Sequence, residues 1–131
     1  MTAERGFTDK AMAVLAEIAA AVERYAAGGG GWTVYINKMG LTREERQAIR
    51  DCLGQGGVRI NIENSAEPAE WLESGMAGVW YGVFYDQSRR PLLEPIEVGG
   101  FPAVAAAQPE DVAYGLAELR KRLEEIRTER G

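Results

Sequence analysis

The segment that most constrains the fold reads GVWYGVFYD, at residues 78–86, and it carries an apolar or aromatic side chain at nearly every position. Successive side chains of a β-strand point to opposite faces of the sheet, so a strand with one face in water alternates apolar with polar residues. This segment does not alternate, because Val79, Tyr81 and Val83 share one face while Trp80 lies on the other. Both faces of this strand therefore need a cover, from the chain itself or from a partner.

Two helices are predicted ahead of this strand. Residues 8–27 carry apolar side chains at steps of three and four, with Thr8 as a cap, which is typical of an amphipathic helix. A second helix is predicted over residues 43–53, because Thr42 and Glu45 have the spacing of a capping box. The predicted buried faces contain Met12, Leu15, Ile18 or Ala19, Val22 and Tyr25 in the first helix, and Ile49, Cys52 and Leu53 in the second.

The β-strands are predicted from alternation and from the turn residues between them. They are expected at residues 32–37, 58–63, 69–74, 78–86 and 92–98. The last three form an antiparallel meander, and the strand–helix–strand order before them permits a right-handed parallel crossover. Pro95 cannot donate to a ladder, so it is expected at an edge or a bulge of the last strand.

A third helix is predicted from Pro109 to about residue 127, because proline loses no hydrogen bond at the first helical position. Its apolar side chains recur at steps of four and three and comprise Val112, Leu116, Leu119, Leu123 and Ile126. An intermolecular coiled coil needs sustained heptads, and these residues cover barely two. We expect this helix to pack on the sheet of its own domain.

These elements predict one α+β domain over residues 1–131. Its sheet is expected to have about five strands in a mixed, mostly antiparallel arrangement. The N-terminal, middle and C-terminal helices are expected to pack mainly on one face of that sheet.

Composition removes several classes of function. The chain has no histidine and a single cysteine, Cys52, so the usual nucleophile–base pairs, an internal disulfide and a thiolate or imidazole metal site are disfavoured. The net charge of -5 repels phosphate backbones, which disfavours nucleic acid as a partner. No segment has the pattern of a signal peptide or a membrane span. We expect a cytoplasmic protein without a cofactor.

Three candidate sites have simpler structural interpretations. The glycine runs at residues 28–31 and 54–57 lie between a helix and the following strand, whereas a phosphate loop leads from strand to helix. Cys52 lies on the predicted inward stripe of its helix, which predicts a buried thiol. The strand carboxylates are spaced like solvent-facing residues, although a catalytic pair among them remains an alternative. They are Glu63, Glu67, Glu70, Glu73, Glu94 and Glu97.

The aromatic strand leaves two interpretations open. Either the strand is central and covered on both faces by the chain, or one apolar face of the sheet is exposed to a partner or to a second copy. In the second case the partner-binding candidates are Trp71, Trp80, Tyr81, Phe84 and Tyr85, with Arg89 and Arg90 at the following turn as a polar rim.

Four stretches of the chain together resemble the C-terminal domain of the hydrogenase expression protein HupH family. They are LTREERQAIRDCLGQGGVRINI, GVWYGVFYD, LLEPIEVG and GFPAVAAAQPEDVAYGLAELRKRL. The resemblance implies a single HupH C-terminal-like domain and an accessory, chaperone-like role in maturing a bacterial nickel–iron uptake hydrogenase. It implies as partners a hydrogenase subunit or other maturation proteins, and it supplies no catalytic residues. The alternatives are a small-molecule enzyme that uses a carboxylate pair, and a self-associating domain that forms a homodimer through the aromatic strand.

Overall fold

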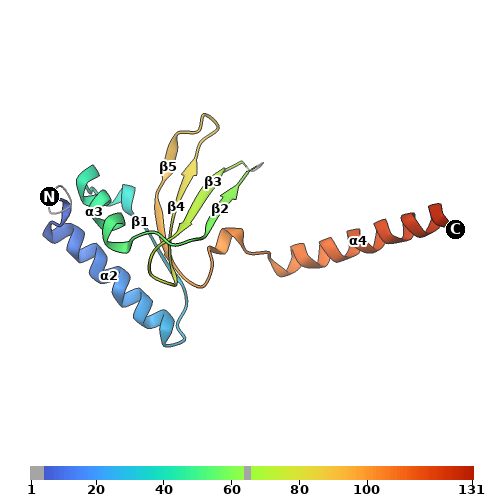
Figure 1. Cartoon of the computed structure of the whole chain (residues 1–131), viewed down its shortest axis with the longest axis horizontal. Coiled ribbons are helices and arrows are strands. Elements are labelled where there is room, and N and C mark those ends of the chain that lie inside the picture. The colour runs from blue at the N-terminus through green and yellow to red at the C-terminus, as the bar shows by residue number, and fades with distance from the viewer. Residues whose placement is uncertain (1–4, 64–65) are drawn as a thin grey trace.

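The chain folds into one antiparallel sheet with two helices on one face and a third helix that projects from the body (Figure 1). The structure, a computed structural model, describes residues 5–63 and 66–131. The strands are β1 (Trp32–Tyr35), β2 (Arg59–Ile62), β3 (Ala69–Glu73), β4 (Val79–Tyr85), β5 (Pro91–Leu93) and β6 (Pro95–Val98). The helices are α2 (Asp9–Ala26), α3 (Arg43–Leu53) and α4 (Pro109–Arg130), with short 3-10 helices η1 (Ile36–Lys38) and η2 (Ala103–Ala105).

The strand order is β1-β6-β4-β3-β2, with β5 beside the far end of β4. This confirms the predicted α+β class and the predicted sheet of about five strands. Every strand pairing among the described residues is antiparallel. The parallel crossover is not formed, because β1 pairs with β6 and thus lies at the opposite edge of the sheet from β2.

The predicted last strand is two strands, and Glu94 separates them. At this break the side chain of Asn37, in η1, takes the place of a neighbouring strand. Its Oδ1 accepts a hydrogen bond from the backbone N–H of Glu94 at 2.9 Å, and its Nδ2 donates to the carbonyl of Leu92 at 2.9 Å. Pro95 therefore begins β6 next to an interruption that is compensated by a side chain.

The main core lies between the sheet and the helices α2 and α3. The side chains of α2 in this core are Ala11, Val14, Ile18 and Ala21, and they meet Ile36, Leu41, Ile49, Leu53, Val79, Ile96 and Val98. The buried face of α2 is therefore offset by about one residue from the face that the sequence predicted. Small side chains let α2 approach its neighbours closely, and this leaves Met12 52% exposed and Leu15 and Val22 only partly buried.

Helix α3 is tied to α2 at its N-terminus. The capping box of Thr42 and Glu45 is present as predicted, and the hydroxyl of Thr8, which caps α2, also donates to the Glu45 carboxylate. The hydrogen bonds from the Thr42 backbone and the Thr8 side chain lower the pKa of Glu45 below its usual value of 4.5. The prediction of a buried Cys52 is wrong, because α3 turns Ala48, Ile49 and Leu53 inward and leaves the thiol exposed.

A smaller core covers the other face of the sheet. Trp71 and Trp80 are 1% and 4% exposed there, and the connection after β6 folds over Trp80. Trp80 donates its indole N–H to the Gly99 carbonyl at 3.2 Å and packs against Phe101 at 5.7 Å between ring centroids. A side chain at Gly82 would place its Cβ 2.7 Å from the ring of Trp71, so the strand needs a glycine at this position.

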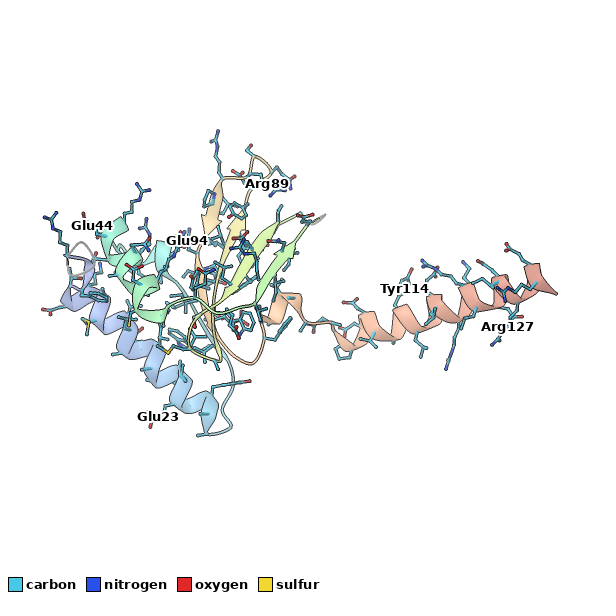
Figure 2. The ribbon with its side chains drawn as sticks, in the orientation of Figure 1. Glu23, Glu44, Arg89, Glu94, Tyr114 and Arg127 are labelled. Carbon is cyan, nitrogen blue, oxygen red and sulfur yellow. The ribbon has the colours of Figure 1, made fainter. Side chains whose placement is uncertain are left out.

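Helix α4 begins at Pro109 as predicted, but the prediction that it packs on the sheet is wrong. None of its side chains is buried, and it extends away from the body on the side opposite α2 (Figure 1). Tyr114 and Arg127 project from it into solvent (Figure 2). The three predicted helices therefore do not share one face of the sheet, because the short connection after η2 directs α4 outward.

Candidate partner-binding surface

The seven predicted contact residues do not form one surface. Trp71 and Trp80 are enclosed in the smaller core, so neither is available to a partner in the folded chain. Phe84 is half-buried on the same face as these tryptophans, against Trp71. Tyr81 and Tyr85 lie on the opposite face, on the helix side of the sheet, and both are half-buried. Arg89 and Arg90 are exposed in the β4–β5 turn.

The helix side of the sheet is covered only in part. The core under α2 and α3 includes Val79, Ile96 and Val98, at one end of the strands. Towards the other end, the same face carries half-buried side chains that we call the open sheet face. Its residues are Leu72, Tyr81, Val83 and Tyr85, with Glu70 on β3 directly opposite Val83. Alternation along β4 places Val83 with the two tyrosines, so Val83 belongs to this face although it is not among the seven predicted contact residues.

The turn next to the open sheet face holds Arg89 in an unfavourable backbone conformation. Arg89 has φ 65, the left-handed region, and it is the one non-glycine residue with positive φ among residues 5–63 and 66–131. Asp86 fixes the turn, because its carboxylate accepts from the backbone N–H groups of Ser88 and Arg90 at 2.7 and 2.9 Å. Glycine would adopt this conformation without the steric cost that a side chain brings.

An ion-pair cluster borders the open sheet face on the α3 side. Arg50 contacts the Glu94 carboxylate at 2.7 Å and Arg46 contacts it at 3.4 Å (Figure 2 labels Glu94). The Arg50 guanidinium also lies over the ring of Tyr81, 5.7 Å from its centroid. These contacts anchor α3 to the break between β5 and β6 and hold Tyr81 in place. Glu94 is therefore engaged in a structural cluster.

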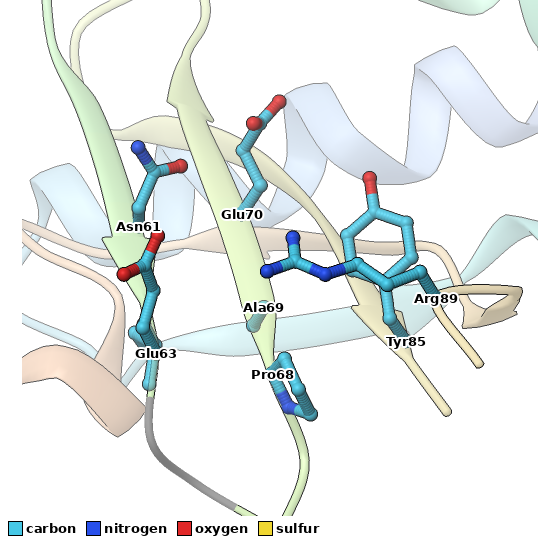
Figure 3. A pocket seen from close by; sticks show the side chains of 8 residues that line it. Asn61, Glu63, Pro68, Ala69, Glu70, Tyr85 and Arg89 are labelled. Carbon is cyan, nitrogen blue, oxygen red and sulfur yellow. The ribbon is translucent and has the colours of Figure 1, made fainter. Parts of the chain in front are cut away.

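Two of the candidate carboxylates, Glu63 and Glu70, line one small hollow at the far end of β2 and β3 (Figure 3). Asn61, Tyr85 and Arg89 line it too, and Figure 3 shows these side chains around the same space. The hollow has a volume of about 70 Å³. Sites for small-molecule substrates usually have roughly 300–1,000 Å³, so this space suits a few water molecules better than a substrate.

A second exposed apolar surface lies between α2, α3 and the β3–β4 turn, and we call it the α2–α3 groove. It is lined by Leu15, Ile18, Ala19, Val22, Cys52, Leu53, Met76 and Val79, and its volume is about 350 Å³. In the sequence, Leu15 and Val22 belong to the apolar face predicted for α2; the core leaves them partly exposed, and they line this groove. Cys52 lines this groove, and no cluster of three metal-ligating side chains occurs within the described part of the chain.

No helix in residues 5–63 and 66–131 is both long enough and apolar enough to cross a membrane.

The sequence is similar to several hydrogenase expression proteins. It is 29% identical to the hydrogenase expression/formation protein HoxQ of Azotobacter vinelandii over 85% of this chain and 41% of that protein. It is 28% identical to the hydrogenase expression/formation protein HupH of Rhizobium leguminosarum bv. viciae over 83% of this chain and 38% of that protein. The chain thus spans about two fifths of the length of these curated relatives.

The fold has a solved counterpart in the hydrogenase expression protein HupH from Thiobacillus denitrificans. The two superpose with a TM-score of 0.82 at 24% identity, over 90% of this chain and 98% of the solved one. Residues 9–126 match the C-terminal conserved region of the HupH hydrogenase expression protein family. The chain therefore belongs to the HupH hydrogenase expression protein family.

Proposed function

We propose that this chain is a non-catalytic, chaperone-like accessory factor in the maturation of a nickel–iron uptake hydrogenase in the bacterial cytoplasm. The observation that carries the proposal is the match of residues 9–126 to the conserved region of a family named for hydrogenase expression. In this role the chain binds a hydrogenase subunit or another maturation protein.

The open sheet face is the surface we assign to that partner. It combines half-buried apolar and aromatic side chains, Val83 and Tyr85 among them, with the exposed charge of Arg89. Protein interfaces favour this mixture of an aromatic centre and a polar, arginine-containing rim. The strained conformation of Arg89 supports the assignment, because the left-handed region costs roughly 1–2 kcal/mol for a residue other than glycine.

The chain's own chemistry favours binding a protein over carrying a metal. A nickel or iron–sulfur carrier needs thiolate or imidazole ligands, and the sequence has one cysteine and no histidine. A carboxylate-based enzyme is a weaker candidate. Glu63 and Glu70 share a hollow too small for a typical substrate, and Glu94 is paired with two arginines.

The test is co-purification of the tagged chain with the precursor of the hydrogenase small subunit, in cells that make the hydrogenase. We expect Arg89→Glu and Val83→Glu to reduce the captured subunit, while Arg43→Glu, at an exposed position of α3, leaves capture unchanged. Arg89→Gly separates binding from folding, because it should raise stability by about 1 kcal/mol and still lower capture.

Two results together would reject the proposal. The first is capture no better than that by an unrelated acidic domain. The second is normal hydrogenase activity after deletion of the gene. Capture that is unaffected by both open-face variants would reject only the assigned surface.

A further inference from the structure

The outer side of β2 carries backbone groups that no part of the described chain pairs. Among residues 5–63 and 66–131 only β3 pairs with β2, so β2 ends the sheet (Figure 1). Glu73 on β3 donates its backbone N–H to the Val58 carbonyl at 2.9 Å, and alternate residues of an antiparallel strand turn these groups the same way. Ile60 and Ile62 therefore direct theirs at β3. The residues that direct theirs outward are called the β2 edge here, and they are Arg59, Asn61 and Glu63.

The β2 edge is exposed. Its side chains lie on the helix side of the sheet, because Asn61 pairs with Glu70 of the open sheet face. α4 does not cover this edge, because none of its side chains is buried and the connection that leads to it lies against Trp80, on the other face. Neither Arg59 nor Glu63 has an ion-pair partner in the part of the chain that the structure describes. An open edge of this kind is a template for another strand.

The β2 edge is complementary to itself in the antiparallel direction. When a second copy pairs with Asn61 opposite Asn61, each Arg59 lies opposite the Glu63 of the other copy. Cross-strand pairs of opposite charge stabilise a sheet, and like charges in that position destabilise it. Centring the pairing on Arg59 or on Glu63 would instead place two like charges opposite each other. Charge therefore favours one register, and it favours a second copy of the chain as the occupant of the edge.

The same register also satisfies the backbone and the apolar side chains of β2. The outward N–H and C=O groups of the β2 edge fall in hydrogen-bonded pairs, which gives about six hydrogen bonds between the copies. Ile60 and Ile62 pack against the smaller core, and they fall opposite Ile62 and Ile60 of the second copy. The Cα atoms of such non-hydrogen-bonded pairs are only about 4.5 Å apart, so these side chains bury one another. The smaller core thus continues across the contact.

We infer that two copies of this chain form a twofold dimer in which the β2 edges pair antiparallel and join the two sheets into one. At the opposite edge of the sheet, β1 has no charged side chain within Trp32–Tyr35, so no charge pair fixes a register there. Pairing at an edge covers neither face, so both open sheet faces stay free on the same side of the joined sheet. The dimer is independent of the proposed function, because it uses a different surface.

The experiment is sedimentation equilibrium of the purified full chain at several concentrations. The wild type is expected at twice the 14.3 kDa chain mass. Arg59→Glu and Glu63→Arg each place two pairs of like charges across the contact, so each should weaken dimerisation by more than about tenfold. Arg43→Glu on α3 and Glu17→Arg on α2 make the same changes of net charge at exposed positions away from the edge, and they should leave dimerisation unchanged.

Exchanging the two charges gives the decisive result. The double variant Arg59→Glu/Glu63→Arg again has opposite charges in both pairs, so it should dimerise as the wild type does. An equal mixture of the two single variants should form a heterodimer for the same reason. Neither recovery is expected if the single variants only damage the fold.

Asn61→Pro tests the backbone pairing. Proline lacks the N–H, and at residue 61 this group points outward, so β2 keeps its hydrogen bonds to β3 while the contact between copies is weakened. Circular dichroism checks that every variant is folded. A monomeric wild type would overturn the inference, and so would a double variant that dimerises as weakly as the single ones. A dimer that tolerates both Arg59→Glu and Asn61→Pro would overturn it too, because the copies would then associate through another surface.

Discussion

Helices α3 and α4 were both predicted from start signals and apolar spacing, yet only α3 packs into a core. α3 buries Ile49 and Leu53 in the main core, whereas α4 buries none of its side chains against the described chain. The difference lies in what holds each helix. Contacts from Thr8 and Glu94 tie α3 to the body, whereas the ion pairs Arg122–Glu118 and Arg127–Glu124 of α4 are exposed and lie within the helix. Apolar periodicity thus predicts a helix, but it does not say what covers its apolar side.

The largest difference is expected for large-to-small substitutions in the two helices. Ile49→Ala should lower the free energy of unfolding by about 2–5 kcal/mol, because it leaves a cavity at a fully buried position. Leu116→Ala, at a position 47% exposed, should change it by no more than about 0.5 kcal/mol. Urea denaturation measures both. Equal losses would show that α4 packs on its own body.

Replacement of glycine by alanine should have opposite effects on stability at two positions, residues 82 and 115. Gly82→Ala should cost about 1–3 kcal/mol, because the new Cβ would overlap the ring of Trp71. Gly115→Ala, in α4, meets no atom within 4 Å and should raise helix content, since alanine favours a helix by about 1 kcal/mol over glycine. Thermal unfolding and circular dichroism separate the two effects. Tolerance of alanine at residue 82 would contradict the packing described for the smaller core.

The helix starts offer a smaller contrast. Thr42→Ala removes the hydroxyl that accepts from the Glu45 backbone at 3.1 Å, and it should cost about 1 kcal/mol. Gln108→Ala, at the start of α4, should have little effect because Gln108 makes no side-chain capping bond. The measurement is again the unfolding free energy. If the two substitutions cost the same, the capping box contributes nothing specific.

The smallest effect is a dependence of stability on pH that arises from Glu45, at the start of α3. The pKa of Glu45 is lower in the folded chain than its usual value of 4.5, so its ionised form stabilises the fold above that value. This contribution is lost as the pH falls from about 4.5 through the lower folded pKa. Glu45→Gln should flatten the stability profile in this acidic window. Glu44→Gln, at an exposed neighbouring position, is the control, and a matching change there would contradict the assignment.

Local signals in the sequence determined most of the elements of this protein. The capping box of α3 and Pro109 at the start of α4 depend on contacts within a few residues, so they were readable in advance. The resemblance to the HupH family was also visible there. Alternation showed that β4 has apolar residues on both faces, and the N-terminal half of β4 is indeed enclosed on both sides.

Tertiary structure decided which apolar side chains are covered. Trp80 faces a connection that follows it by about twenty residues, and Leu15 and Val22 lie outside the core because small alanines of α2 pack more closely. These outcomes depend on contacts between segments far apart in the chain. Periodicity indicates which side of a helix or strand is apolar, but it does not indicate which segment packs against that side. The exposure of α4 has the same origin, since the path of three residues after η2 sets where the helix points.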